Sequence, residues 1–92
     1  MVDALISPEV VARYAADAAR EVDGVTGIVE GVRKGIRVDG DEIELHLSMR
    51  WGVSIPDVGA AVQNRVVDYL ERMADMRPAA VNVVVEEVDG RS

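Results

Sequence analysis

The sequence contains a few side chains that could do chemistry, but none of them belongs to a recognisable catalytic motif. His46 lies between Glu44 and Ser48 on the polar side of an alternating pattern. Histidine titrates near neutral pH, so a pH-sensitive contact is one hypothesis for this position. No nucleophile or second base accompanies His46 at a known spacing, and a solvated strand residue is the interpretation that we favour.

A second set of candidates consists of carboxylates in one helical pattern: Asp57, Asp68, Glu71 and Asp75. Paired carboxylates can transfer protons or hold Mg²⁺. The same spacing is typical of a solvated helix face, particularly with Arg65 and Arg72 close by. The chain has no cysteine and a single histidine, which excludes thiolate chemistry and histidine clusters. We therefore expect no enzymatic activity, no catalytic residue, no metal site and no cofactor.

One cluster of basic residues comprises Arg33, Lys34 and Arg37, with Arg50 further along. Such a cluster could bind a small phosphorylated or lipid ligand, and the chain would then be an accessory subunit. We favour ion pairs with Glu42 and Glu44 across a hairpin, because the chain carries a formal charge of −7.

The segment Gly24-Val25-Thr26-Gly27 matches the GxxG spacing of the KH fold, in which a backbone loop clamps nucleic-acid phosphates. A KH-like nucleic-acid-binding module is therefore an alternative function. Here the motif falls between a helix and a strand, with Glu21, Asp23 and Glu30 around it, whereas phosphate binding needs cations. We favour a structural role for both glycines and do not expect nucleic acid as a partner.

Length and composition favour one small domain. We expect it to cover residues 1–92, with an ordered core over residues 6–88 and a frayed tail over residues 89–92. A core of this size is small, so self-association would add stability, and we expect a homo-oligomer. The N-terminal residues do not resemble a signal peptide, and no run of about 18 apolar residues could span a membrane. These features predict a cytoplasmic protein without direct membrane insertion.

Capping and turn residues place the first elements. Ser7-Pro8-Glu9 predicts a helix start, and Gly24 predicts the end of that helix. Two short strands are expected over Val25–Val29 and Lys34–Val38. The dipeptide Asp39-Gly40 then predicts a hairpin with a type I′ turn, because this turn needs positive φ at both central residues.

A long strand, Glu42–Trp51, is expected to pair antiparallel with its predecessor. Its apolar residues alternate strictly with polar ones: Ile43, Leu45, Leu47, Met49 and Trp51. Ser54 and Asp57 fit a capping box for a second helix, which is expected to end near Met76. The segment Val81–Val85 is apolar on both faces and predicts a last strand that is interior or covered by a partner, before an acidic tail.

Together these elements predict an α+β fold in the order α-β-β-β-α-β, with two helices packed on one face of a mainly antiparallel sheet. Trp51 is either a core residue, which we favour, or a partly exposed anchor for a partner. The candidate interaction surface comprises Trp51, Val81, Val83 and Val85. It would serve self-association or partner docking, by edge pairing or hydrophobic anchoring.

Several segments resemble the alkaline shock protein family of mainly Gram-positive bacteria. They are Ile6-Ser7-Pro8-Glu9-Val10, Glu21-Val22-Asp23-Gly24-Val25, Gly52-Val53-Ser54-Ile55-Pro56-Asp57-Val58 with Val62-Gln63, and Val81-Asn82-Val83. They follow one another in the family's order over nearly the whole chain. Two departures are that Trp51 stands where the family usually has tyrosine, and that the Gly27–Val32 segment is shorter than the usual insert.

The resemblance implies a non-enzymatic cytoplasmic protein of cell-envelope homeostasis and of general or alkaline stress. Some members of the family associate with themselves and are held near the membrane by a small anchoring protein. For this chain the resemblance therefore implies protein partners and a peripheral membrane location reached through a partner. The family has no agreed catalytic or cofactor residues that could be carried over.

Overall fold

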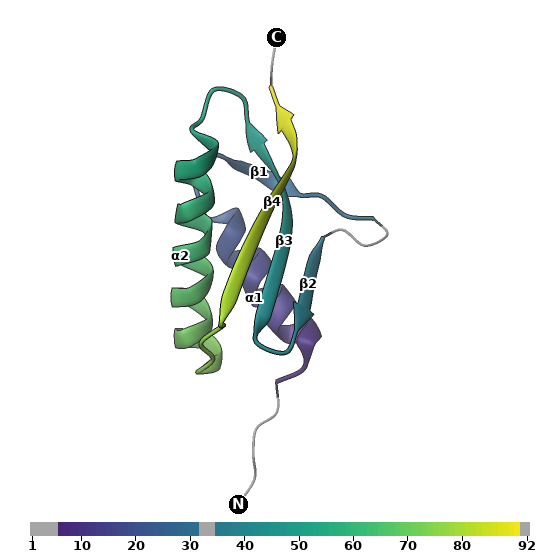
Figure 1. The fold of residues 1–92 in the computed structure, drawn as a ribbon, viewed down its shortest axis with the longest axis vertical. Coiled ribbons are helices and arrows are strands. Elements are labelled where there is room, and N and C mark those ends of the chain that lie inside the picture. The colour runs from purple at the N-terminus through teal and green to yellow at the C-terminus, as the bar shows by residue number, and fades with distance from the viewer. Residues whose placement is uncertain (1–5, 32–34, 91–92) are drawn as a thin grey trace, which may run out of the picture.

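One strand, β3, is central to the structure. The computed structural model describes residues 6–31 and 35–90. Its elements are α1 (Pro8–Arg20), β1 (Val25–Ile28), β2 (Ile36–Asp39), β3 (Glu42–Arg50), α2 (Ile55–Ala74) and β4 (Ala80–Asp89), shown in Figure 1. The predicted α+β class and the order α-β-β-β-α-β are confirmed.

Both helices begin where the sequence predicts. The side-chain oxygen of Ser7 accepts a hydrogen bond from the Val10 amide, and that of Ser54 accepts one from the Asp57 amide. These bonds satisfy amide groups that have no partner within the helix. The end of α1 differs from the prediction, because this helix stops at Arg20 and a turn leads to Gly24.

β3 is the central strand of the four-stranded sheet that the described residues form. β2 and β1 pair antiparallel with successive halves of one edge of β3, and β4 pairs parallel with the other edge. The α2 crossover has the length that this parallel pairing needs. Its 20 residues span about 30 Å, and the 9 residues of β3 also span about 30 Å.

β1 and β2 behave as one strand that is interrupted opposite His46. The Val29 amide donates a hydrogen bond to the His46 carbonyl at 2.8 Å, and the His46 amide donates one to the Gly35 carbonyl at 2.8 Å. The chain therefore leaves the sheet and returns to it beside a single residue of β3.

The hairpin between β2 and β3 forms, but its turn differs from the prediction. Asp39 pairs with Glu42, so the two loop residues are Gly40 and Asp41. Gly40 has a φ of 62°, whereas Asp41 is not among the residues with positive φ. A glycine with positive φ at the first central position is typical of type II′, so the predicted type I′ turn at Asp39-Gly40 is wrong.

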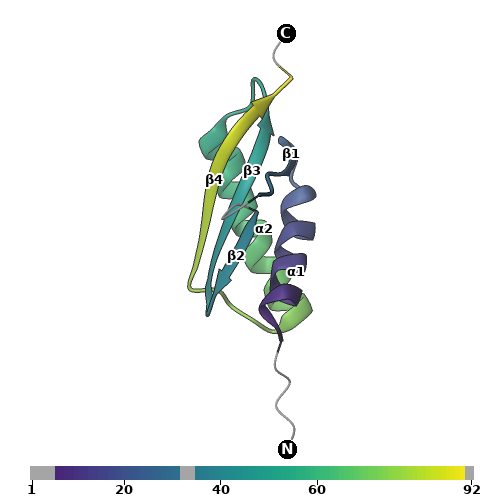
Figure 2. The ribbon, with the colours of Figure 1, turned by 90° about the vertical axis from the view of Figure 1, so that its right-hand side faces the viewer.

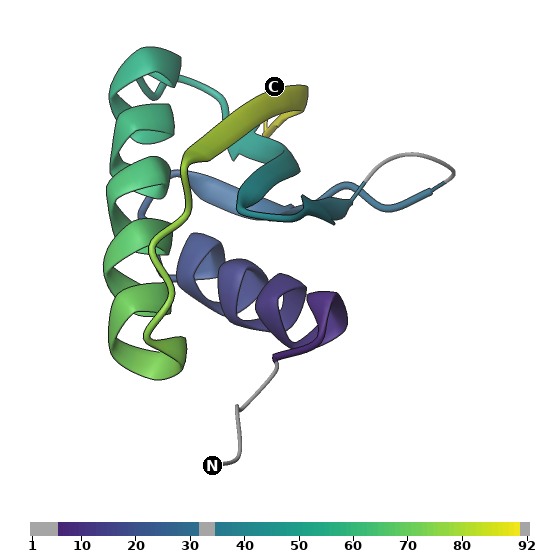
Figure 3. The same ribbon diagram turned by 60° about the horizontal axis from the view of Figure 1, so that its bottom comes forward.

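The core lies between the sheet and both helices, which cover the same face (Figures 2 and 3). Its fully buried residues come from β3 and α2, with small alanines from α1: Ile43, Leu45, Leu47, Met49, Val62, Val66, Leu70, Ala15, Ala18 and Ala19. Alanines let α1 approach the sheet closely. Tyr14 and Tyr69 add an edge-to-face contact between the helices, with ring centroids 5.9 Å apart.

The last strand corrects two expectations. β4 pairs with β3 alone, so among the described residues it is an edge strand and not an interior one. It also continues through Glu86 to Asp89, where the sequence suggested an acidic tail. Arg91 and Ser92 of that tail lie outside the described residues. The apolar run Val81–Val85 arises because alternate valines pack towards the helices, whereas Val84 lies beside His46 on the opposite face.

Candidate interaction surface

The face of the sheet that no helix covers is predominantly acidic. Its carboxylates come from three strands: Asp39, Glu42, Glu44, Glu86, Glu87 and Asp89. Among the described residues, the cationic groups on the same face are Arg37, Arg50 and His46. We call this surface the acidic face. Among residues 6–31 and 35–90, carboxylates outnumber cationic groups on this face even when His46 is protonated, so these residues give it a negative potential.

His46 lies at the centre of the acidic face and joins β3 to β4. Its Nε2 lies 2.8 Å from a carboxylate oxygen of Glu44, and its Nδ1 lies 2.9 Å from one of Glu86. Only 11% of the His46 side chain is exposed. The hydrogen bond with Glu44, then that with Glu86, raises the pKa of His46 above its ordinary value of 6.5, although burial acts in the opposite direction.

The expected solvated histidine is therefore wrong. Sequence reasoning missed the partner Glu86, because the acidic residues after Val85 were assigned to a tail. Glu86 occupies a bulge, since the pairing passes from Leu47–Val85 to Ser48–Glu87. A β-bulge adds one residue to a strand and changes the direction in which a side chain points. Here the Glu86 carboxylate contacts the ring of His46.

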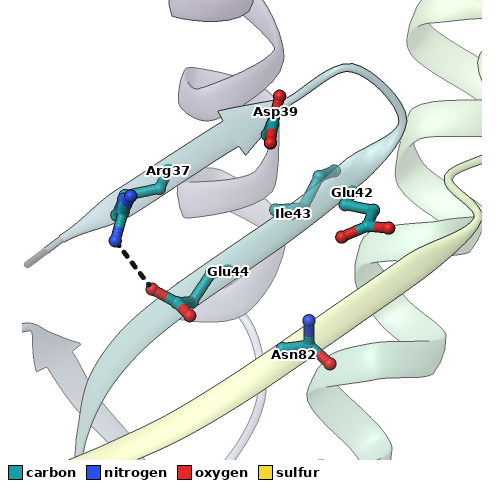
Figure 4. Close-up of a pocket in the computed structure, with 6 residues that line it drawn as sticks. All are labelled: Arg37, Asp39, Glu42, Ile43, Glu44 and Asn82. Atoms are coloured by element: carbon teal, nitrogen blue, oxygen red, sulfur yellow. Dashed lines mark ion pairs between the residues drawn. The ribbon is translucent and has the colours of Figure 1, made fainter.

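A shallow hollow of about 150 Å³ opens on the acidic face between the β2–β3 hairpin and β4 (Figure 4). It is lined by Arg37, Asp39, Glu42, Ile43, Glu44 and Asn82. Arg37 lies 3.6 Å from Glu44, which confirms the predicted pairing across the hairpin. Neither Asp39 nor Glu42 makes an ion pair with another described residue, so within that part of the chain the negative charge of these two carboxylates is not compensated.

The outer edge of β4 has no strand beside it in the described part of the chain. An edge strand presents backbone N–H and C=O groups that can pair with another chain. Val81 is buried, and Val83 packs against the core. The Gln63 side chain of α2 donates a hydrogen bond to the Val81 carbonyl at 2.9 Å, which anchors the start of β4.

Trp51 is exposed, so the favoured core interpretation is wrong. It follows the last residue of β3, and 54% of its surface is accessible. Its amide donates a hydrogen bond to the Asp89 carbonyl at the end of β4. Ile55 and Val88, also exposed, line with Trp51 an open hollow of about 290 Å³. We call these three residues the Trp51 corner. Exposed aromatic residues within apolar patches are typical of protein interfaces.

The four residues proposed from the sequence do not form one continuous surface. Val81, Val83 and Val85 point to the helix side of β4, whereas Trp51 lies beyond its opposite end. The parts that a partner could reach are therefore the outer edge of β4 and the Trp51 corner. Val88 belongs to that corner. Sequence reasoning missed it, as it missed Glu86, because the residues after Val85 were assigned to a tail.

The proposed basic patch is only partly described. Arg33 and Lys34 lie outside the described residues, and Arg37 is paired with Glu44. Arg50 lies 3.2 Å from Asp23. The carboxylates of α2 also pair locally, Asp68 with Arg72 and Glu71 with Arg77, as expected for a solvated helix face.

The GxxG segment has structural explanations at both ends. Gly24 has a φ of 103°, and a Cβ at this position would lie 2.9 Å from a methyl group of Val58. Gly27 lies in β1 next to a register shift opposite Ser48. Phosphate binding is not needed to explain either glycine.

Within residues 6–31 and 35–90, no group of three or more His, Cys, Asp or Glu side chains is placed to hold a metal ion. In the same residues, neither helix combines the length and the apolar character that crossing a membrane requires.

Sequence similarity identifies the family. A profile described as "Asp23 family, cell envelope-related function" matches residues 30–90, which include β2, β3, α2 and β4. The chain belongs to the Asp23 family. (This is the name of the family, not the aspartate at position 23.) The resemblance to alkaline shock proteins is thereby confirmed. One relative is the uncharacterized protein YqhY of Bacillus subtilis (strain 168), 35% identical over 95 residues that cover 85% of this chain and 70% of YqhY.

The fold of this Asp23 family member is similar to that of solved MamM structures. A MamM CTD variant in its nickel form superposes with a TM-score of 0.63 and 21% identity, over 88% of this chain and 99% of that one. Another MamM variant gives 0.63 at 21% identity, over 91% and 89% of the two chains. At this level of identity the similarity shows a shared fold and carries no conclusion about metal binding.

Proposed function

We propose that this member of the Asp23 family is a non-enzymatic scaffold of the cell envelope that associates with copies of itself and with protein partners. It acts in the cytoplasm during general or alkaline stress, and a small membrane-anchoring protein brings it to the membrane. The family's cell envelope-related function supports the cellular role. The observation that carries the mechanism is the outer edge of β4, which pairs with no other strand of the described residues.

The edge of β4 has the properties that strand addition needs. It is 10 residues long, whereas exposed edges are usually kept short or blocked by proline, and β4 contains no proline. Its three acidic residues lie in its second half, after four valines and an asparagine. The first half therefore lacks the charges that protect most edges.

The distribution of charge along β4 favours an antiparallel pair of copies. With Val84 on the two-fold axis, Glu86 of one copy lies opposite Asn82 of the other, and Val88 lies opposite Ala80. Parallel pairing would instead place each acidic residue beside its own copy, which is destabilising. A symmetric dimer with a continuous sheet is the simplest closed assembly of this kind.

A charge-swap experiment at Val84 tests the proposal. Val84→Lys and Val84→Glu would each place two like charges across the two-fold axis, and we expect each variant alone to be monomeric by light scattering. An equimolar mixture should recover the mass of the wild-type assembly, because lysine then faces glutamate. Asn64→Lys, on the exposed face of α2, is the matched control and should leave the mass unchanged.

Recovery in the mixture also shows that both variants still fold. A wild-type protein that is monomeric at all concentrations would refute self-association, and variants that keep the wild-type mass would refute the role of β4. Affinity capture from the membrane fraction tests the partner, and we expect a small membrane protein to be recovered. Loss of that protein with Trp51→Ala, but not with Asn64→Lys, would assign its docking to the Trp51 corner.

A further inference from the structure

We infer that the acidic face docks an extended, lysine- and arginine-rich segment of a partner protein, one cationic side chain of which enters the hollow between the β2–β3 hairpin and β4. The inference rests on the proposed interaction role. It uses the open face of the sheet, which is a different surface from the β4 edge and from the Trp51 corner.

The acidic face is available to a partner because both helices lie on the other side of the sheet (Figure 2). Its charge is not neutralised within the described residues. Arg37 is engaged by Glu44, and Arg50 is engaged by Asp23, which lies outside the face. Glu87 and the two carboxylates of the hollow, Asp39 and Glu42, have no ion pair among these residues.

The hollow has the size and chemistry of a site for one cationic side chain. Its volume of about 150 Å³ is too small for a folded element but sufficient for a guanidinium or ammonium group. Figure 4 shows Arg37 directed at Glu44 at one end, with Asp39, Glu42 and Asn82 around the rest. These side chains offer carboxylate and carboxamide oxygens, which accept hydrogen bonds from the several N–H groups of arginine.

Charge selects among the ligands that such a face could accept. Phosphates of nucleic acids or anionic lipids would be repelled by a face whose described residues include twice as many carboxylates as cationic groups. A bare metal ion would need at least three converging ligands, and no such group occurs among the described residues. A cation with several donors, carried on a flexible side chain, remains the best match.

The spacing of the carboxylates favours an extended partner. Glu42 and Glu44 are two residues apart on one face of β3, which is about 7 Å. Arg37 and His46 both contact the Oε2 atom of Glu44, so among the described residues its Oε1 atom is the acceptor left for a partner. An extended peptide presents alternate side chains to one side at the same spacing. The partner segment should therefore carry lysine or arginine at alternate positions rather than in a continuous block.

Two synthetic peptides test the inference on the full chain. The first is a fluorescein-labelled ten-residue peptide of alternating arginine and threonine. The second has the same composition, with five arginines followed by five threonines. Fluorescence anisotropy at 50 mM NaCl should show the alternating peptide binding at least about fivefold more tightly, and binding should weaken as salt is raised.

Matched variants separate the hollow from general electrostatic attraction. Asp39→Asn combined with Glu42→Gln should weaken binding of the alternating peptide about tenfold, because both substitutions remove charge from the hollow. Asp68→Asn combined with Glu71→Gln removes the same charge from the exposed face of α2 and should leave binding within about twofold of wild type.

Equal losses in the two double variants would overturn the inference, as would equal binding of both peptides or no binding at 50 mM NaCl. Failure of the Val84 charge swap would not affect these results, because peptide binding to the acidic face is measured whether the protein is a monomer or an assembly. The inference and the self-association mechanism can thus fail separately.

Discussion

The contact of His46 with two carboxylates makes the stability of this protein depend on pH near neutrality. Protonated histidine donates from both ring nitrogens, so it bonds to Glu44 and Glu86 at once. Neutral histidine keeps a single N–H, and its other nitrogen then faces a carboxylate oxygen that cannot donate. Deprotonation therefore removes one of these two charge-assisted hydrogen bonds, of which the one with Glu86 joins β3 to β4.

The direction of the pKa shift determines whether the protein becomes more or less stable as the pH rises. The pKa of His46 is raised in the folded protein above the 6.5 expected for the unfolded chain. The stabilisation is therefore fully present below pH 6.5 and is lost as the pH rises through the folded pKa.

The size of the effect follows from the exposure of the two carboxylates. A hydrogen bond to a charged group contributes about 1.5–3 kcal/mol. The side chains of Glu44 and Glu86 are 36% and 23% exposed, so solvent reduces this contribution. We expect a loss of about 1–2 kcal/mol between pH 6 and pH 9, out of about 5–15 kcal/mol for a small domain.

Urea unfolding at a series of pH values, compared with His46→Gln, measures this effect. The difference in the free energy of unfolding between wild type and variant should shrink as the pH rises from 6 to 9. Titration of the α-amino group is common to both proteins and cancels. Glu71→Gln, far from the contact, should follow the wild-type curve. A difference that stays constant over this range would refute the reasoning.

Two further predictions concern the core and the backbone. Leu47→Ala should lower the free energy of unfolding by about 2–5 kcal/mol, because Leu47 is fully buried at the centre of the sheet; Val88→Ala at an exposed site should cost much less, and similar urea midpoints for the two would contradict this. Gly24→Ala should cost about 1–3 kcal/mol, since its Cβ would approach Val58 to 2.9 Å at a φ of 103°. Gly40→Ala is the control for positive φ without a clash and should be milder; equal losses would show that contact with Val58 is unimportant.

Local signals in the sequence were sufficient to predict most of the helices and strands. Ser7 and Ser54 each lie where a helix needs a hydrogen-bond acceptor, and both act as predicted. The alternation along β3 predicts its buried face correctly from Ile43 to Met49. It fails only at Trp51, because the strand ends at Arg50 and the pattern no longer determines which way the side chain points.

The features that the sequence did not predict depend on contacts between distant residues. An apolar run such as Val81–Val85 is compatible with an interior strand and with an edge strand covered by a helix. Only the pairing with β3 distinguishes them. The contact between His46 and Glu86 joins residues 40 positions apart and depends on a bulge, for which the sequence offers no marker. The acidic face likewise appears only once β2, β3 and β4 lie side by side.

The interruption between β1 and β2 also bears on how this domain can change length during evolution or engineering. Both ends of the interruption are held by the backbone of one residue, His46, so the connecting segment starts and finishes at nearly the same place. Doubling the length of such a loop costs only about 0.6 kcal/mol of closure entropy. An epitope tag or a small domain inserted between Val29 and Gly35 should therefore leave the register of both flanking strands intact.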